Sequence, residues 1–409
     1  MLFKTDRFGM FIHFGIYAVN AWHEQEQMRR GIAKNEYIKN ADIFNPYKFD
    51  AEKWVLFAKE SGAQYICFTT KHHDGFCMWD THFTDYKITN TPFKRDILKE
   101  LADACRKYDI KLELYYSCPD WNYIHSVNNG GSHQLPVPNP GDEPDEDLYI
   151  QYVKNQITEL LTNYGKIYAI FWDIPPVRRD KSVNELVRKL QPHILINDRG
   201  YDEGDYSTPE RDDTASNFSR LCEACQSVGY QSWGYRENED YFTSQSLISS
   251  VSKILIKGGN YLLNVGPNSL GEIPERSANI FRDVGTWYKK IYNSIVDTKY
   301  IKSGDFEYTV KGNSLFLHLP AAFGCSGAVL KPITIAPEKL IFLNGEEKIE
   351  GKIEYTPVDY NGKDNTPHLH LYNIPAEKYI KENMVIQMDF NNIDDVLNLL
   401  NNKTEKRIL

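Results

Sequence analysis

The stretch Tyr168-Ala-Ile-Phe-Trp-Asp173-Ile-Pro-Pro176 decides how the fold of this chain is interpreted. An apolar and aromatic run ends at one carboxylate, and two prolines then stop it. Runs of this length between chain breakers are typical of strands that are buried on both faces. An acid at the C-terminal tip of such a strand is typical of a (β/α)-barrel active site. Taken alone, Asp173 fits a helix cap or a turn equally well.

The same pattern, an apolar strand with a polar tip, recurs through most of the chain. It predicts strands at residues 7–13, 65–70, 111–117, 168–173, 193–199, 231–235 and 260–265. Helical spacing of apolar residues predicts helices near 23–30, 50–62, 96–108, 147–164, 182–190, 244–257 and 275–292. This alternation predicts a (β/α)8-like barrel with its site at the C-terminal rim of the strands. Because only seven strands are identified, we expect the barrel to be irregular between Gly200 and Tyr230.

The sequence changes character from about Tyr300 onward. Short segments of alternating apolar and polar residues, separated by Gly and Asn, predict a small antiparallel β-sandwich. We therefore expect a catalytic barrel domain at residues 1–297 and a sandwich domain at 298–392. The tail at 393–409 is expected to be a short helix or a frayed end.

Composition excludes several classes of function. The net charge is −9 and the pI is about 5.7, which argues against a surface that binds nucleic acid. No run of about 18 apolar residues is present, so no membrane span is expected. The N-terminal residues lack the features of a signal peptide, which favours a cytoplasmic enzyme, or a secreted one if a leader has been removed.

The seven cysteines are odd in number, and several lie in apolar stretches, which favours buried thiols in a reducing compartment. Cys222-Glu-Ala-Cys225 has the spacing of half a zinc site. No second pair and no His-x3-His accompanies it, so we expect neither a structural metal nor another cofactor.

Histidines gather at the predicted strand tips. His13 ends the first strand, and the second runs into His72 and His73, with Trp79 and Trp121 nearby. Each histidine alone is more typical of a satisfied core residue. A zinc site is a second alternative, but no His-x-His or His-Glu-x-x-His spacing occurs. Sugar hydroxyls need mixed donors and acceptors, which neutral histidine supplies, so we favour a sugar site.

Glycoside hydrolysis requires a pair of carboxyl groups, of which one stays ionised and the other donates a proton. Asp173 is the natural nucleophile because a central strand would hold it rigidly. Arg199 follows another strand and could hold a carboxylate or a sugar oxygen, although a surface ion pair is as plausible. Spacing alone leaves four candidates for the acid, namely Glu210, Glu223, Glu24 and Asp120.

Eight motifs in order resemble the α-L-fucosidases of glycoside hydrolase family 29, over roughly residues 7–292. They are Phe8-Gly-Met-Phe-Ile-His-Phe-Gly15, Thr70-Lys-His-His-Asp-Gly-Phe76, Leu114-Tyr-Tyr-Ser117 with Trp121, Phe171-Trp-Asp173, Asn197-Asp-Arg199, Thr208-Pro-Glu-Arg211, Ser232-Trp-Gly-Tyr235 and Gly258-Gly-Asn-Tyr-Leu-Leu-Asn-Val-Gly-Pro267.

The resemblance implies a retaining mechanism through a covalent fucosyl–enzyme, with a fucosylated oligosaccharide or glycoconjugate as substrate. Asp173 matches the nucleophile, and Glu210 matches the acid/base of the branch that cleaves α-1,3/1,4-linked fucose; Glu223 is the second choice. The resemblance places His13, His72, His73 and Arg199 on sugar hydroxyls, and Tyr116 and Trp172 on the walls of the site. Trp79 and Trp121 are also expected to bind the substrate, because they lie near the predicted strand tips.

Three segments depart from the family pattern. Ile174-Pro-Pro176 stands where glycine often follows the nucleophile, and Leu221-Cys222 stands where tryptophan usually precedes the acid near Glu223. His23-Glu-Gln-Glu-Gln27 replaces a Glu-Trp-Tyr motif, which leaves the linkage preference open. The alternatives are an exo-glycosidase that acts on another sugar, such as an α-L-galactoside, or an inactive carbohydrate-binding relative. The presence of both Asp173 and Glu210 argues against the inactive relative.

Overall fold

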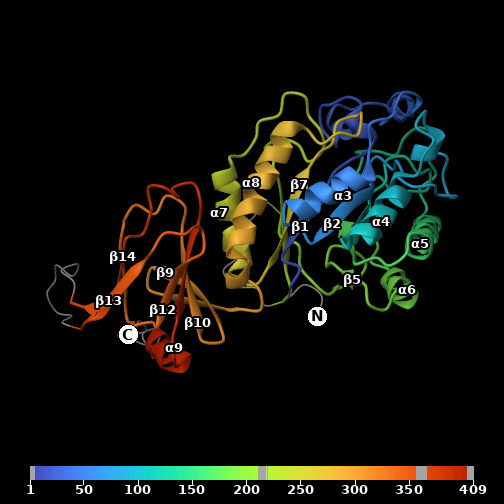
Figure 1. Cartoon of the computed structure of the whole chain (residues 1–409). Helices are drawn as coiled ribbons and strands as arrows, with labels where there is room; N and C mark the ends of the chain where they lie inside the picture. Colours follow the sequence, from blue (N-terminus) through green and yellow to red (C-terminus); the bar gives the residue numbers. More distant parts are fainter. Residues whose placement is uncertain (1–4, 211–217, 219, 356–365, 403–409) are drawn as a thin grey trace.

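The computed structural model describes residues 5–210, 218, 220–355 and 366–402 of the chain. A curled parallel sheet surrounded by helices occupies the N-terminal part, and antiparallel sheets form the C-terminal part (Figure 1). The predicted fold class, a barrel followed by antiparallel β-structure, is confirmed.

Seven parallel strands form the sheet of the first part, in the order β5-β4-β3-β2-β1-β7-β6. Their bounds are β1 Phe8–Ile12, β2 Tyr65–Lys71, β3 Lys111–Ser117, β4 Ala169–Asp173, β5 Leu195–Ile196, β6 Glu223–Ser227 and β7 Asn260–Val265.

One predicted strand is wrong. The sixth strand is β6, and residues 231–235 form a loop instead. The backbone amides of Trp233 and Gly234 donate to the Glu24 carboxylate (3.0 and 3.1 Å) rather than to a neighbouring strand. A buried carboxylate thus satisfies the backbone donors that a strand would have used.

The predicted irregularity lies where the sheet closes. The extended segment 206–210 forms isolated parallel bridges, Asn197 to Tyr206 on one side and Ser207 to Cys222 and Glu210 to Cys225 on the other. This segment therefore takes the place of an eighth strand between β5 and β6. Residues 211–217 of the irregular region, including Arg211 of the quoted motif, lie outside the described part of the chain.

Helices cover the outside of the sheet (Figure 1). They are α1 Glu26–Arg29, α2 Lys34–Tyr37, α3 Ala51–Glu60, α4 Ile97–Tyr108, α5 Glu146–Asn163, α6 Ser182–Leu190, α7 Ser244–Leu255 and α8 Glu275–Ile291, with short 3-10 turns at Ile16–Ala18, Ile38–Asp42, Ile88–Asn90 and Tyr292–Ser294. Asp50, Asp96 and Asp145 cap α3, α4 and α5 by accepting a backbone N–H three residues later, as a side-chain N-cap does.

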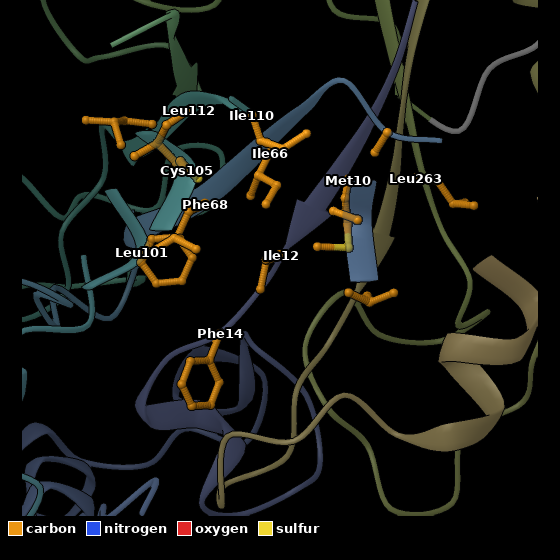
Figure 2. Packing of buried hydrophobic residues seen from close by; sticks show 14 of the residues in the cluster. Met10, Ile12, Phe14, Ile66, Phe68, Leu101, Cys105, Ile110, Leu112 and Leu263 are labelled. Carbon is orange, nitrogen blue, oxygen red and sulfur yellow. The ribbon is translucent and has the colours of Figure 1, made fainter. Parts of the chain in front are cut away.

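Successive residues of a barrel strand pack in turn into two hydrophobic clusters, one between the sheet and the helices and one inside the barrel. Met10, Ile12, Ile66 and Phe68 pack outward in the same hydrophobic cluster as Leu101 of α4 (Figure 2). The residues between them in the strands, such as Phe11 and Cys67, join a smaller cluster inside the barrel with Tyr115 and Phe171. Because side chains alternate along a strand, this register decides which residues can reach a site inside the rim.

Two antiparallel sheets form the C-terminal part, with the orders β12-β15-β10-β9-β8 and β11-β14-β13. The strands are β8 Lys299–Ser303, β9 Phe306–Lys311, β10 Ser314–Leu319, β11 Ala328–Leu330, β12 Lys339–Phe342, β13 Glu350–Glu354, β14 His368–Tyr372 and β15 Met384–Asp389. Side chains of both sheets share one hydrophobic cluster, which also takes Val396 and Leu400 of α9 (Ile393–Asn402). The tail thus begins as a helix, and residues 403–409 lie outside the described part.

The two parts meet at α7 and α8, which lie on the side of the barrel that faces the sheets (Figure 1). The Trp287 indole donates to the backbone carbonyl of Asn383 (2.8 Å), and Lys290 pairs with Glu382 (3.0 Å). In the described ranges, no helix combines the length and the apolar character needed to cross a membrane.

Candidate active site

A cavity opens at the C-terminal ends of the barrel strands. It is lined by Phe11, His13, Gln25, His72, His73, Tyr115, His133, Phe171, Asp173, Ile174, Arg199, Glu210, Cys225 and Trp233. Both carboxylic acids proposed from the sequence, the three histidines and the arginine therefore meet in one place. This is the rim at which barrel enzymes carry their active sites.

Asp173, the last residue of β4, is held by two hydrogen bonds. The Tyr115 hydroxyl donates to one carboxylate oxygen (2.7 Å), and the Arg199 guanidinium donates to the other (2.7 Å). Burial alone would raise the pKa of Asp173, but the Arg199 charge, the Tyr115 hydrogen bond and the nearby His72 ring lower it below its usual value. Asp173 is therefore an anion that points into the cavity.

Arg199 also connects Asp173 to Glu210. Its Nη1 atom, which donates to Asp173, lies 3.1 Å from Glu210 Oε2. Its remaining donors are fixed, because Nε donates to the Thr208 hydroxyl and Nη2 to the Thr208 carbonyl (both 2.7 Å). The side chain of Glu210 is 41% exposed and that of Asp173 only 13%. One acid is thus enclosed, and the other stands at the opening.

The shared nitrogen limits the separation of the two acids. Their nearest oxygens can lie no farther apart than the 2.7 Å and 3.1 Å contacts placed end to end. Because this limit applies to the nearest oxygens alone, it is compatible with the ~5–5.5 Å separation of the carboxyl groups in retaining glycosidases.

Two of the three histidines, His72 and His73, are neutral groups within this site. Burial, and then the neighbouring histidines, lower the pKa of both His72 and His73 well below the usual value. His13 and His73 are oriented through Nδ1, by Asn264 and by Ser117 respectively (both 2.7 Å). Neutral imidazoles in fixed orientations can donate to or accept from uncharged hydroxyl groups.

Four residues predicted for the site do not line the cavity. Tyr116 and Trp172 point to the outer face of the sheet, where the tyrosine hydroxyl donates to Gln156 (2.6 Å) and the indole to Asn184 (2.9 Å). Trp79 is fully buried and donates to Glu159 (3.2 Å). Trp121 supports the site from behind, with its ring 5.4 Å from that of His73. The placing of Tyr116 and Trp172 on the walls fails because they have the opposite strand parity to Asp173.

The other candidate acids also lie elsewhere. Glu223 begins β6, at the opposite end of the strand from the rim, and accepts from the Tyr65 hydroxyl (2.6 Å). Burial, and then the neighbouring carboxyl of Glu113, raise its pKa well above the usual value. Glu24 holds the loop of Trp233, and its pKa is lowered to about 2 because His23, His72 and the Ser232 hydroxyl outweigh burial. Asp120 pairs with the buried Lys71 (2.8 Å).

The sequence prediction missed several lining residues. Tyr115 and Phe171 pair across β3 and β4, and both have the parity that faces the interior. Counting back by two from Asp173 would have found Phe171 and, through the register, Tyr115. Trp233 stacks on His13 with ring centroids 5.2 Å apart. No sequence signal predicted this contact, because it depends on the loop that replaces the expected strand.

Among the residues that the structure describes, no group of three or more His, Cys, Asp or Glu side chains is arranged to hold a metal ion. Most polar groups of the cavity are instead held by each other or by neighbouring side-chain and backbone atoms, whereas the buried Nδ1 of His72 has no hydrogen-bond partner in the described part of the chain. What they present to a ligand is one anion, one exposed acid, neutral imidazoles and aromatic faces. This set suits an uncharged polyol with an apolar side.

Known proteins resemble this chain over most of its length. The family model described as α-L-fucosidase matches residues 1–293. Tissue α-L-fucosidase of Macaca fascicularis is 27% identical, over 92% of this chain and 86% of its own. The structure of α-L-fucosidase isoenzyme 1 from Paenibacillus thiaminolyticus superposes with a TM-score of 0.85 at 32% identity and covers 95% of this chain and 98% of that one.

A further solved structure is an α-L-fucosidase of family 29 from Bacteroides thetaiotaomicron, trapped as a covalent intermediate. It is 25% identical to this chain, with a TM-score of 0.78 and coverage of 95% of this chain and 94% of that one. The family match spans the whole barrel, and the likeness of the solved structures continues through the C-terminal sheets. The chain belongs to the α-L-fucosidases of glycoside hydrolase family 29, and it is an enzyme of that activity.

Proposed function

We propose that this α-L-fucosidase works with retention of configuration, with Asp173 as the nucleophile and Glu210 as the general acid and base. The observation that carries this proposal is the Arg199 bridge. It holds an enclosed carboxylate and an exposed carboxyl close together, at 2.7 and 3.1 Å from one nitrogen.

Each acid suits a different half of the reaction. Asp173 is kept ionised, so its oxygen attacks C1 of fucose while the bond from C1 to the leaving oxygen breaks. Glu210 stands at the opening, where it gives its proton to that oxygen. It then takes a proton from the water that attacks C1 and releases Asp173. The neutral histidines bind the ring hydroxyls without competing for the proton.

We further propose that the preferred substrates carry terminal fucose in α-1,3 or α-1,4 linkage. Glu210 within Thr208-Pro-Glu, which resembles the motif of the branch with that preference, supports this. A panel of oligosaccharides that differ only in fucosyl linkage tests it. We expect α-1,3 and α-1,4 fucose to be released faster than α-1,2 or α-1,6 fucose, and the reverse order would contradict the assignment.

Two alternatives differ in what the panel would show. An enzyme for α-L-galactosides would hydrolyse an aryl α-L-galactoside at least as fast as the fucoside, although the two differ by one hydroxyl at C6. A carbohydrate-binding relative would bind fucosides without releasing sugar. The pairing of both acids through Arg199 favours catalysis, because binding alone has no need of two carboxyl groups.

Replacement of the nucleophile gives the first prediction. Asp173→Ala is expected to reduce turnover by several orders of magnitude, because no covalent intermediate forms. Added azide or formate should restore part of the activity by entering the space of the lost carboxylate, and the product is then a fucosyl azide or formate. The measurement is product analysis by nuclear magnetic resonance. Undiminished activity of Asp173→Ala would refute the assignment.

Replacement of the acid gives a second prediction. Glu210→Ala should slow the release of fucose from natural glycans by about 10²–10⁴-fold, the usual contribution of general acid catalysis. An aryl fucoside with a good leaving group needs less protonation and should be affected much less in the first half-reaction. Glu223→Gln is the matched control, because Glu223 lies at the other end of β6. If Glu223→Gln shows the substrate-dependent loss instead, the assignment of the acid is wrong.

The Tyr115 hydrogen bond gives a prediction on pH. A hydrogen bond to a charged group stabilises the ionised form. Tyr115→Phe removes such a bond, so the pKa of Asp173 should rise. The acidic limb of kcat/KM then moves to higher pH by the same amount. Tyr116→Phe, on the other face of the sheet, should leave the limb in place.

A further inference from the structure

Two residues at the rim of the cavity have an unusual backbone. His133 and Ile174 both line the site, and their φ angles are +56° and +59°. Eight non-glycine residues of the described chain have positive φ, and Ile174 is the only β-branched one among them. Such a conformation costs about 1–3 kcal/mol and persists only where the surroundings enforce it, which is most often at functional sites.

Ile174 is strained on two counts. It follows Asp173 directly and precedes Pro175, and a residue before proline favours an extended rather than a left-handed backbone. A glycine would adopt this φ without penalty. The sequence has isoleucine instead, and its side chain is half-buried at the cavity. We infer that the strained backbone is retained because this side chain is needed there.

His133 is held from several sides. It lies in the long segment between β3 and α5, and its carbonyl accepts from the Trp121 indole (2.7 Å). The Ser132 hydroxyl lies 2.9 Å from its Nδ1. Trp121 in turn donates its backbone N–H to His73 (2.7 Å), so the position of His133 is tied to the buried part of the site.

The two residues come from neighbouring segments. A second, small cavity lies between these segments and is lined by Gln134 together with Pro175 and Pro176, which follow His133 and Ile174 in the chain. The His133 ring is half-buried and lies 5.2 Å from that of His73, which is 1% exposed. His133 therefore stands farther out than the histidines beside Asp173.

We propose that His133 and Ile174 form the subsite for the leaving group, the pyranose unit that carries the fucose. Ile174 offers an apolar contact to the C–H face of that sugar, and His133 Nε2 forms a hydrogen bond with one of its hydroxyls. The proposal rests on the placement of fucose over Asp173 under the proposed function. Beyond that function, the proposal assigns His133 and Ile174 as residues that determine which leaving group the enzyme prefers.

The test compares two substrates with different leaving groups. α-L-Fucosyl fluoride has a leaving group of one atom, which cannot reach the rim, whereas the oligosaccharide of the linkage panel that is hydrolysed fastest fills it. His133→Gly and Ile174→Gly should each lower the ratio of kcat/KM for the oligosaccharide to kcat/KM for the fluoride by at least about fivefold. His133→Asn, which tolerates the same backbone and keeps a polar group, should restore part of the ratio.

Two controls separate this contact from a general loss of structure. Because Ile174→Gly relieves strain, its melting temperature should equal or exceed that of the parent enzyme. His125→Ala changes a histidine in the same segment that bonds to the Glu143 carbonyl (2.7 Å), and it should leave the ratio within twofold. An unchanged ratio in both rim variants would overturn the inference, even if Asp173→Ala is inactive; an active Asp173→Ala would refute the proposed nucleophile instead.

Discussion

The guanidinium of Arg199 is the contact on which the site depends. It joins the end of β5 to the tip of β4 through Asp173 and to the barrel-closing segment 206–210 through Thr208 and Glu210. Two acidic groups this close would repel each other when charged, and the positive charge between them offsets that repulsion. The pKa of Arg199 is raised despite its burial, mainly by Asp173, so that charge is permanent. Barrel closure and the charge state of Asp173, the proposed nucleophile, therefore rest on the same side chain.

The sequence was sufficient for the parts of the fold that local patterns encode. Apolar runs with polar tips predicted six of the seven strands, and the helical spacing of apolar residues predicted α3 to α8. The prediction failed where long-range contacts determine the local structure. The Glu24 carboxylate accepts from the backbone amides of residues 233 and 234, so this segment forms a loop and not the expected strand. The prediction for Tyr116 and Trp172 failed because it took no account of strand parity, which alternates along β4 from Asp173. Glu223 was excluded only when its position at the start of β6 was known.

The site is held by two different physical means. Around Asp173, oriented hydrogen bonds and a charge pair fix the groups, and burial keeps His72 and His73 neutral. At the rim, His133 and Ile174 are held by enforced backbone conformations in connecting segments. The rigid arrangement around Asp173 suits the bond cleavage that is common to all substrates, because its groups keep the same positions for each of them. The second lies in segments whose length and sequence can change without disturbing the barrel, and this is where recognition of different leaving groups is expected to reside.

Trapping the intermediate on this chain tests the role of Asp173 as the nucleophile directly. Incubation with a 2-fluoro-fucosyl fluoride slows the release of the sugar from the enzyme, and mass spectrometry of the digested protein then locates the modified residue. We expect one sugar per chain on the peptide that contains Asp173, and no label in Asp173→Ala. A label on Glu210, or a first product of inverted configuration without any labelled protein, would contradict it.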